Sequence, residues 1–181
     1  MPRIQPVDPQ SATGAAATHL ATTKKLFGSV PNMFATAAQS PAVIEAMLGF
    51  FGALGKASLG AKVGEQIAIA VAQANGCGYC LSAHTAIGKM HGVSAADLQG
   101  ARQAKASDPK VAALLTLASA INQSRGHVDD ETLAAARAAG ATDAEIVEVI
   151  AHVALNVFTN TLNNVSETEI DFPRVELNAA A

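Results

Sequence analysis

The chain has 181 residues, of which 50% are apolar, and its formal net charge is −3. A chain of this length can bury a sizeable core, so we expect residues 1–181 to form one domain. The absence of a basic block argues against a nucleic-acid partner and against a polybasic membrane anchor. The N-terminal sequence lacks the apolar core of a signal peptide, and the longest apolar stretch, residues 67–74, is too short to cross a bilayer. We therefore expect a cytoplasmic protein with no membrane partner.

The composition favours an all-α fold. Only 4% of the residues are aromatic and alanine is abundant, whereas strands favour β-branched and aromatic residues. Helix starts are indicated where an N-cap residue precedes proline, or where two residues have the spacing of a capping box. Four places show these signals: Ser40-Pro41, Ser94-x-x-Asp97, Asp108-Pro109 and Thr142-x-x-Glu145.

Taken in chain order, residues 1–10 contain three prolines and indicate an N-terminal arm, and residues 28–34 indicate a loop. Two glycines at 76 and 78 allow a tight turn between two helices, which predicts a helical hairpin in the middle of a bundle. A tail, residues 165–181, carries Ile170 and Phe172 past the last helix, and we expect it at a subunit interface. The predicted helices span residues 11–25, 41–54, 61–75, 79–91, a short segment after Ser94, 109–123, 129–138 and 143–164.

The two cysteines of the chain lie in the predicted hairpin, in the sequence NGCGYCLSAHT of residues 75–85. An α-helix turns by about 100° per residue, so Cys77, Cys80 and His84 share one face. A single structural disulfide would not persist in a reducing compartment. Three alternatives remain open: a redox dithiol, a metal site, and two buried thiols that only fill space.

The redox alternative follows from the position of the cysteines in the first turn of their helix. Free backbone N–H groups and the helix dipole stabilise a thiolate there, so we expect a low thiol pKa. His84, one turn after Cys80, can hold or shuttle its proton, which favours Cys80 as the attacking thiolate. Cys77 would then capture a sulfenic acid on Cys80 as a disulfide.

Two further residues belong to the candidate site. Glu65 begins an otherwise apolar helix; it is either a solvated charge at the helix N-terminus or a buried base opposite Cys80 and His84, where desolvation would raise its pKa. We expect the second interpretation. Tyr79, the single tyrosine, is expected to form a partly buried wall of the site with its hydroxyl in water.

The metal alternative would use a Cys₂His₂ set of Cys77, Cys80, His84 and His91. All four come from one short helix, which rarely surrounds a tetrahedral ion, so we expect neither a metal nor another cofactor. The inert alternative stays open because free cysteine is often buried. We expect His91 to interact with a helix dipole and His152 to be a satisfied core histidine.

The segment EQIAIAVAQANGCGYCLSAHT, which contains Glu65, Cys77, Cys80 and His84, resembles the signature of the AhpD-like alkylhydroperoxidases within the carboxymuconolactone decarboxylase superfamily. The stretches DPKVAALLTLASAI, HVDDETLAAARAAGATDAEIVEVI and NVFTNTLNNVSETEIDFP also resemble the family, the last one its peroxidase-related branch. The resemblance covers most of residues 28–173. Tyr79 departs from the best-known members, which carry a second histidine at this place.

This resemblance implies a multihelical bundle that assembles as a homo-oligomer, a trimer or a hexamer, and reduces peroxides. It implies that Cys80 is the peroxidatic thiol, that Cys77 resolves it, and that Glu65 and His84 relay its proton. A dithiol reductant, such as a lipoyl protein or a thioredoxin-like protein, would reset the disulfide. The decarboxylase branch lacks the dithiol, which argues against lactone decarboxylation. The alternatives are a redox-responsive binding protein and a dithiol oxidoreductase with a non-peroxide substrate.

Overall fold

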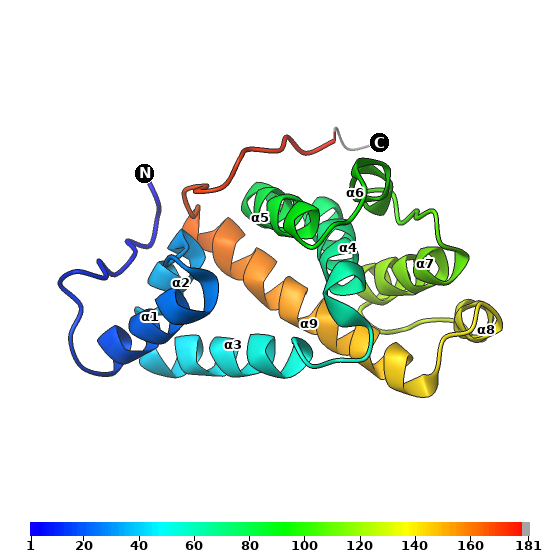
Figure 1. Ribbon diagram of the computed structural model, residues 1–181, viewed down its shortest axis with the longest axis horizontal. Coiled ribbons are helices and arrows are strands. Elements are labelled where there is room, and N and C mark those ends of the chain that lie inside the picture. Colours follow the sequence, from blue (N-terminus) through cyan, green and yellow to red (C-terminus); the bar gives the residue numbers. More distant parts are fainter. Residues whose placement is uncertain (179–181) are drawn as a thin grey trace.

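The computed structural model describes residues 1–178, and within them every regular element is an α-helix (Figure 1). The all-α prediction is confirmed. The helices of this part of the chain are α1 (Gly14–Phe27), α2 (Asn32–Ala37), α3 (Pro41–Leu54), α4 (Gly60–Ala74), α5 (Gly78–Met90), α6 (Ala95–Ala101), α7 (Pro109–Ser124), α8 (Asp130–Ala138) and α9 (Asp143–Ser166).

Two helices form the centre of the bundle. The long helix α9 crosses the molecule, and α4 packs against it while also contacting α5, α6 and α7 (Figure 1). The segment from Ile67 to Ala72 is buried on all sides of α4, as its continuous apolar sequence predicts. No helix within residues 1–178 is long and apolar enough to cross a membrane.

Helices α4 and α5 form the predicted hairpin. The turn between them needs Gly76, whose φ of +63° is a left-handed conformation that glycine adopts without steric cost. The backbone N–H of Cys77 donates to the carbonyl of Ala72 across this turn. The hairpin therefore brings the start of α5 back against the end of α4.

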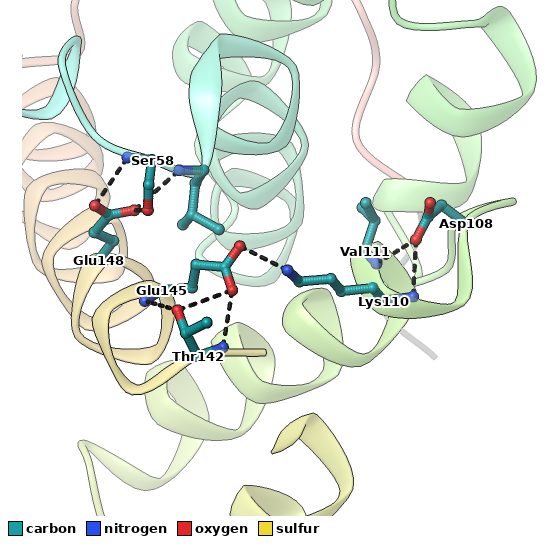
Figure 2. A network of polar contacts seen from close by, with 8 residues as sticks. Ser58, Asp108, Lys110, Val111, Thr142, Glu145 and Glu148 are labelled. Carbon is teal, nitrogen blue, oxygen red and sulfur yellow. Dashed lines mark hydrogen bonds and ion pairs between the residues drawn. The ribbon is translucent and has the colours of Figure 1, made fainter. Parts of the chain in front are cut away.

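Capping side chains fix where α7 and α9 begin (Figure 2). Asp108 accepts hydrogen bonds from the first N–H groups of α7. Thr142 and Glu145 form the predicted capping box, and Glu145 also accepts a bond of 2.7 Å from Lys110 at the start of α7. This bond and the N–H group of Thr142 lower the pKa of Glu145. The starts of the two helices are thus tied to each other.

A second carboxylate ties α9 to the start of α4. Glu148 accepts bonds from the backbone N–H groups of Ser58 and Leu59 and from the hydroxyl of Ser58, at 2.9–3.0 Å (Figure 2). Partial burial opposes ionisation of Glu148, but these bonds outweigh it and lower its pKa. Because α4 has no capping side chain of its own, this carboxylate from α9 replaces one.

Most predicted helix bounds agree with the structure to within three residues, but α2 was missed. Residues 28–34 look like a loop because they contain glycine, proline and asparagine. In the structure Pro31 precedes a helix of six residues, five of which are buried. Tertiary burial, not helical propensity, stabilises so short a helix.

Both ends of the described chain lie on the bundle. In the N-terminal arm the N–H groups of Arg3 and Val7 donate to backbone carbonyls of residues 166 and 35. The tail runs past α5 toward α6 (Figure 1), and Ile170 and Phe172 pack partly buried against the core of their own chain. The expected place of residues 165–181 at a subunit interface stays a prediction, and residues 179–181 lie outside the described part.

Candidate active site

The dithiol sits where the hairpin turn meets α5. Cys77 is the N-cap of α5, and its sulfur accepts a hydrogen bond of 3.3 Å from the backbone N–H of Cys80. Cys80 is the third residue of the helix, so both sulfurs lie at the positive end of its dipole. Both cysteines are free thiols, as a reduced dithiol would be.

Both sulfurs are buried, and a residue from another helix contacts one of them. Cys77 is 0% exposed and Cys80 is 2% exposed. The side-chain amide of Asn163, on α9, donates a hydrogen bond of 3.2 Å to the sulfur of Cys80. Cys80 therefore has a hydrogen-bond donor aimed at its sulfur, which is the environment that stabilises a thiolate.

The surroundings of the pair make the two thiols unequal. The pKa of Cys80 is lowered to about 6 by the Cys77 thiol acting as its hydrogen-bond donor, by the nearby charge of His84, and by the amides of Asn163 and Asn160, which together outweigh burial. The pKa of Cys77 is raised by its hydrogen bond to Cys80, by burial and by the charge on Cys80. Cys80 is accordingly the more acidic of the two thiols.

The hairpin brings Glu65 and His84 together. Oε2 of Glu65, on α4, lies 2.8 Å from Nδ1 of His84, on α5, and the two side chains are only 17% and 14% exposed. Burial alone would lower the pKa of His84, but the charge of Glu65, the hydrogen bond to it and the nearby Cys80 raise it. Glu65 thus faces His84, as expected, and is not a solvated charge at a helix end.

A cavity of about 280 Å³ opens beside the Glu65–His84 pair. Glu65 and His84 line it together with His152 of α9, His91, and residues of α3 and α4. Neither cysteine contributes to its lining. The cavity therefore gives water access to the Glu65–His84 pair, and the charge of His84 also acts on the buried Cys80.

We expected His152 to be a satisfied core histidine. In the structure it is only partly buried and lines the cavity. Burial lowers its pKa, against the opposing charges of Glu148 and Glu65. Its ring packs directly on Gly64, where a Cβ would come within 2.8 Å of Cε1. A glycine in a helix interior destabilises the helix, and this close approach explains why position 64 has one.

Tyr79 requires a correction. It is only 5% exposed, and its hydroxyl accepts a hydrogen bond of 3.2 Å from the backbone N–H of Met33 in α2. The ring packs edge-on against Phe172 of the tail, with centroids 5.8 Å apart. Burial raises its pKa. The expectation of a hydroxyl in water is wrong, because α2 and the tail cover this side of α5; a role as a wall of the site stays a prediction.

Within residues 1–178, no three His, Cys, Asp or Glu side chains are gathered in a way that could hold a metal ion. The four residues of the Cys₂His₂ alternative do not converge on one point, since Nδ1 of His84 is hydrogen-bonded to Glu65 and His91 is exposed. The arrangement has the features of a stabilised thiolate with an adjacent thiol, next to a Glu65–His84 pair that is open to water.

Sequence reasoning missed the contribution of α9. Asn163 and Asn160 act on Cys80 from 83 and 80 positions further along the chain, and no local spacing announces such a contact. The one available signal was the run of asparagine and threonine within an otherwise apolar helix, NVFTNTLNN, because polar residues on a buried helix face need partners.

The sequence model of the carboxymuconolactone decarboxylase family matches residues 41–122 and 100–167. The chain belongs to this family. The matched part includes the α4–α5 hairpin and the whole of α9, and so Glu65, Cys77, Cys80, His84 and both asparagines that act on Cys80. No curated protein sequence matches the chain.

Several solved structures have the same fold as this chain. A peroxidase-related protein from Ralstonia eutropha with the alkylhydroperoxidase AhpD core is 24% identical, with a TM-score of 0.82 over 94% of this chain and 92% of the other. A peroxidase-related protein from Silicibacter is 19% identical, with a TM-score of 0.75 over 92% and 91%. A debrominase in complex with 2,3,4-tribromopyrrole is 22% identical, with a TM-score of 0.79 over 93% and 91%. The protein is therefore an AhpD-like member of the family in its fold.

Proposed function

We propose that the protein is a thiol-dependent peroxidase that reduces hydrogen peroxide or organic hydroperoxides. The observation that carries the proposal is a buried Cys80 whose pKa is lowered to about 6 beside a protonated Cys77. A thiolate attacks the O–O bond, whereas a thiol does not, and the adjacent thiol protects the product from further oxidation.

The proposed cycle has three steps. The Cys80 thiolate attacks one peroxide oxygen, the O–O bond breaks, and a proton converts the leaving oxygen into an alcohol or water, which leaves a sulfenic acid on Cys80. The Cys77 thiol then displaces hydroxide from this sulfur, giving the Cys77–Cys80 disulfide and water. Finally a dithiol donor reduces the disulfide by two electrons and is itself oxidised.

His84 and Glu65 supply the proton path in this proposal. His84 lines the cavity, is hydrogen-bonded to Glu65 at 2.8 Å, and carries a charge that lowers the pKa of Cys80. A histidinium in this place can donate the proton that the leaving oxygen needs, and Glu65 holds the ring and stabilises its charge. The imidazole regains a proton from water in the cavity.

Stopped-flow mixing of the reduced protein with hydrogen peroxide, and separately with tert-butyl hydroperoxide, tests the proposal. We expect second-order oxidation at least a hundred times faster than that of a free cysteine at the same pH, and two thiols lost per peroxide consumed. Oxidation no faster than that of free cysteine would mean that peroxide is not the substrate.

A second candidate is reductive chemistry on another substrate with the same dithiol. The debrominase among the neighbours in fold was solved as a cysteine-to-alanine variant with a brominated pyrrole, which favours testing halogenated aromatic compounds. Such a reaction replaces bromine by hydrogen, releases bromide and forms the same disulfide. Bromide release without peroxide turnover would favour this candidate. If the protein has neither activity but its oligomeric mass changes with the redox state of the dithiol, a redox-responsive binding protein would be favoured.

The partners are proposals that accompany the cycle. We propose a dithiol reductant, a lipoyl protein or a thioredoxin-like protein, because the disulfide must be reduced by two electrons after each turnover. We also propose a homo-oligomer, a trimer or a hexamer, with a second copy on the exposed apolar face of α9. Turnover with each reductant in excess peroxide, and light scattering at micromolar concentration, test the two proposals separately.

A further inference from the structure

The end of α9 next to the dithiol carries a line of buried polar side chains with unused hydrogen-bonding atoms. Within residues 1–178, Nδ2 of Asn160, Oδ1 of Asn163, Oγ of Ser166 and Oγ1 of Thr168 have no hydrogen-bond partner. All four residues are less than 9% exposed. Buried polar atoms in folded proteins nearly always have a partner, so such a cluster in one place calls for a ligand or solvent there.

Two of these residues are at the sulfur of Cys80. Asn163 donates through Nδ2 to this sulfur at 3.2 Å, so its unused Oδ1, on the same amide, lies in the immediate surroundings of the sulfur. Asn160, one turn earlier on α9, is held the opposite way round: its Oδ1 accepts a bond of 3.0 Å from Asn75, and its Nδ2 is left free. This nitrogen makes no hydrogen bond of good geometry, yet it acts on the nearby sulfur of Cys80 as a weak donor and lowers the pKa of Cys80.

These contacts fix the two amides in complementary roles. Asn75 donates to Oδ1 of Asn160, and Nδ2 of Asn163 donates to the sulfur of Cys80. The donor Nδ2 of Asn160 and the acceptor Oδ1 of Asn163 therefore remain without partners beside the thiolate. A hydroperoxide group, HO–OR, has one hydrogen to donate and oxygens that accept. Such a group can therefore satisfy both amides while one of its oxygens faces the sulfur.

We propose that Asn160 and Asn163 form the binding site for the hydroperoxide group, an inference that rests on the peroxidase function proposed above. Oδ1 of Asn163 accepts the O–H of the substrate and so holds the attacked oxygen toward Cys80. Nδ2 of Asn160 donates to the other oxygen, the one that departs.

The assignment gives each amide a defined part in the first step. A bond forms between the sulfur and the hydroxyl oxygen, the O–O bond breaks, and its electron pair passes to the departing oxygen. The donor of Asn160 stabilises the negative charge that develops there, as a donor does in an oxyanion hole. A proton from His84 completes the alcohol or water, and sulfenic acid remains on Cys80.

The decisive variant is Asn160→Leu, which removes the free donor and keeps the branched shape and the number of side-chain heavy atoms. We expect the rate of oxidation by peroxide, per thiolate, to fall by about a hundredfold, the scale for loss of one such donor. The rate of alkylation by iodoacetamide, per thiolate, should stay within threefold of the parent, because that reaction has no departing oxygen. If Asn160→Leu folds poorly, Asn160→Asp keeps the acceptor for Asn75, lacks the donor, and should show the same split.

Asn164→Leu is the matched control. It removes an amide one residue away from Asn163 on the exposed side of α9, where Asn164 donates to the carbonyl of Asn75. Both rates should stay within threefold of the parent. Equal losses of oxidation and alkylation in Asn160→Leu would show that the residue only supports the fold around Cys80, and would overturn the assignment.

The two proposals fail in different ways. A parent protein that reacts quickly with peroxide, together with an Asn160→Leu protein that reacts equally quickly, overturns the binding site and leaves the peroxidase function standing. A parent that reacts no faster than free cysteine overturns both. A crystal structure of the reduced protein gives an independent check, since solvent bridging the two amides beside Cys80 supports the site and amides bonded directly to each other contradict it.

Discussion

The two faces of α9 reverse the usual pattern of a helix at a protein surface. On the face toward the dithiol, the buried side chains of its second half are mostly polar, among them Asn156, Thr159, Asn160 and Asn163. On the opposite face the exposed side chains are large and apolar: Val147 (62% exposed), Ile150 (48%), Val157 (39%), Phe158 (41%) and Val165 (57%). A helix that only supported the fold would have the opposite arrangement.

The difference teaches that the two faces serve different ends. Burying amides costs free energy unless they find partners, and a chain that retains them next to a thiolate gains a stabilised charge in return. Exposing a line of large apolar residues favours contact with another protein surface. We therefore expect changes around the inner face to alter the chemistry and changes on the outer face to leave it intact.

The largest effect should come from the thiolate that the inner face stabilises. Cys80→Ser should abolish peroxide turnover, because serine has no thiolate. Cys77→Ser keeps an N-cap for α5 and should leave a sulfenic acid on Cys80 that dimedone traps and mass spectrometry locates. A sulfenic acid found on Cys77 in the Cys80→Ser protein would reverse the two roles.

The next largest effect on the rate of Cys80 oxidation should come from the Glu65–His84 pair, which lines the cavity. Glu65→Gln keeps the shape of the side chain and removes its charge, so it should slow the oxidation of Cys80 at pH 7 by roughly a hundredfold, the scale of general acid–base catalysis. The loss should shrink at high pH, where His84 of the parent also loses the proton that it donates to the leaving oxygen. A variant as fast as the parent at pH 7 would limit Glu65 to a structural contact with His84.

A smaller effect is expected for the pH dependence of the reactivity of Cys80, which tests whether the inner face of α9 stabilises the thiolate. Because the pKa of Cys80 is lowered to about 6, the thiolate persists at neutral pH and is lost only as the pH falls through that value. Alkylation by iodoacetamide should therefore fall about tenfold between pH 7 and pH 5. Asn163→Leu removes a donor to the sulfur and should move the midpoint to higher pH; an unchanged midpoint would mean that the inner face does not stabilise the charge.

Gly64→Ala tests how tightly α9 fits over α4. The added Cβ would lie 2.8 Å from the ring of His152, so the ring or the helix must move. Overpacking of this kind destabilises a protein by about 1–3 kcal/mol, against a smaller gain from helix propensity. Urea unfolding measures the change, with Gly49→Ala on α3, where a Cβ meets nothing within 4 Å, as the control.

The outer face should give the smallest effect on chemistry. Phe158→Asp places a charge in the exposed apolar line, so it should lower the molecular mass measured by light scattering if a second copy covers this face. The alkylation rate of Cys80 should stay within twofold of the parent, because Phe158 is on the far side of α9 from the thiolate. A parent protein that is already monomeric at micromolar concentration would contradict the proposal that a second copy covers this face of α9.

The fold was predictable to the extent that its signals are local. The caps at Asp108 and Thr142 gave helix starts correctly because each one satisfies N–H groups within three residues of itself. The missed helix α2 and the wrongly placed hydroxyl of Tyr79 have a common cause. Both depend on burial by segments far away in the chain, the tail among them, and local propensity carries no information about such contacts.

For the site, the sequence by itself determined which chemical groups are available and how they follow one another on α5. The helical repeat places Cys80 and His84 one turn apart, directly after the N-cap residue Cys77, and the glycine turn brings α5 back along α4 so that His84 reaches Glu65. Only the tertiary structure decided what surrounds the sulfur. Asn163 and Asn160 reach Cys80 because α9 packs across the hairpin, and the pKa difference between the two thiols depends partly on those contacts. Spacing along a helix fixes directions over a few residues, whereas the electrostatic environment of a buried group is set by every element packed against it.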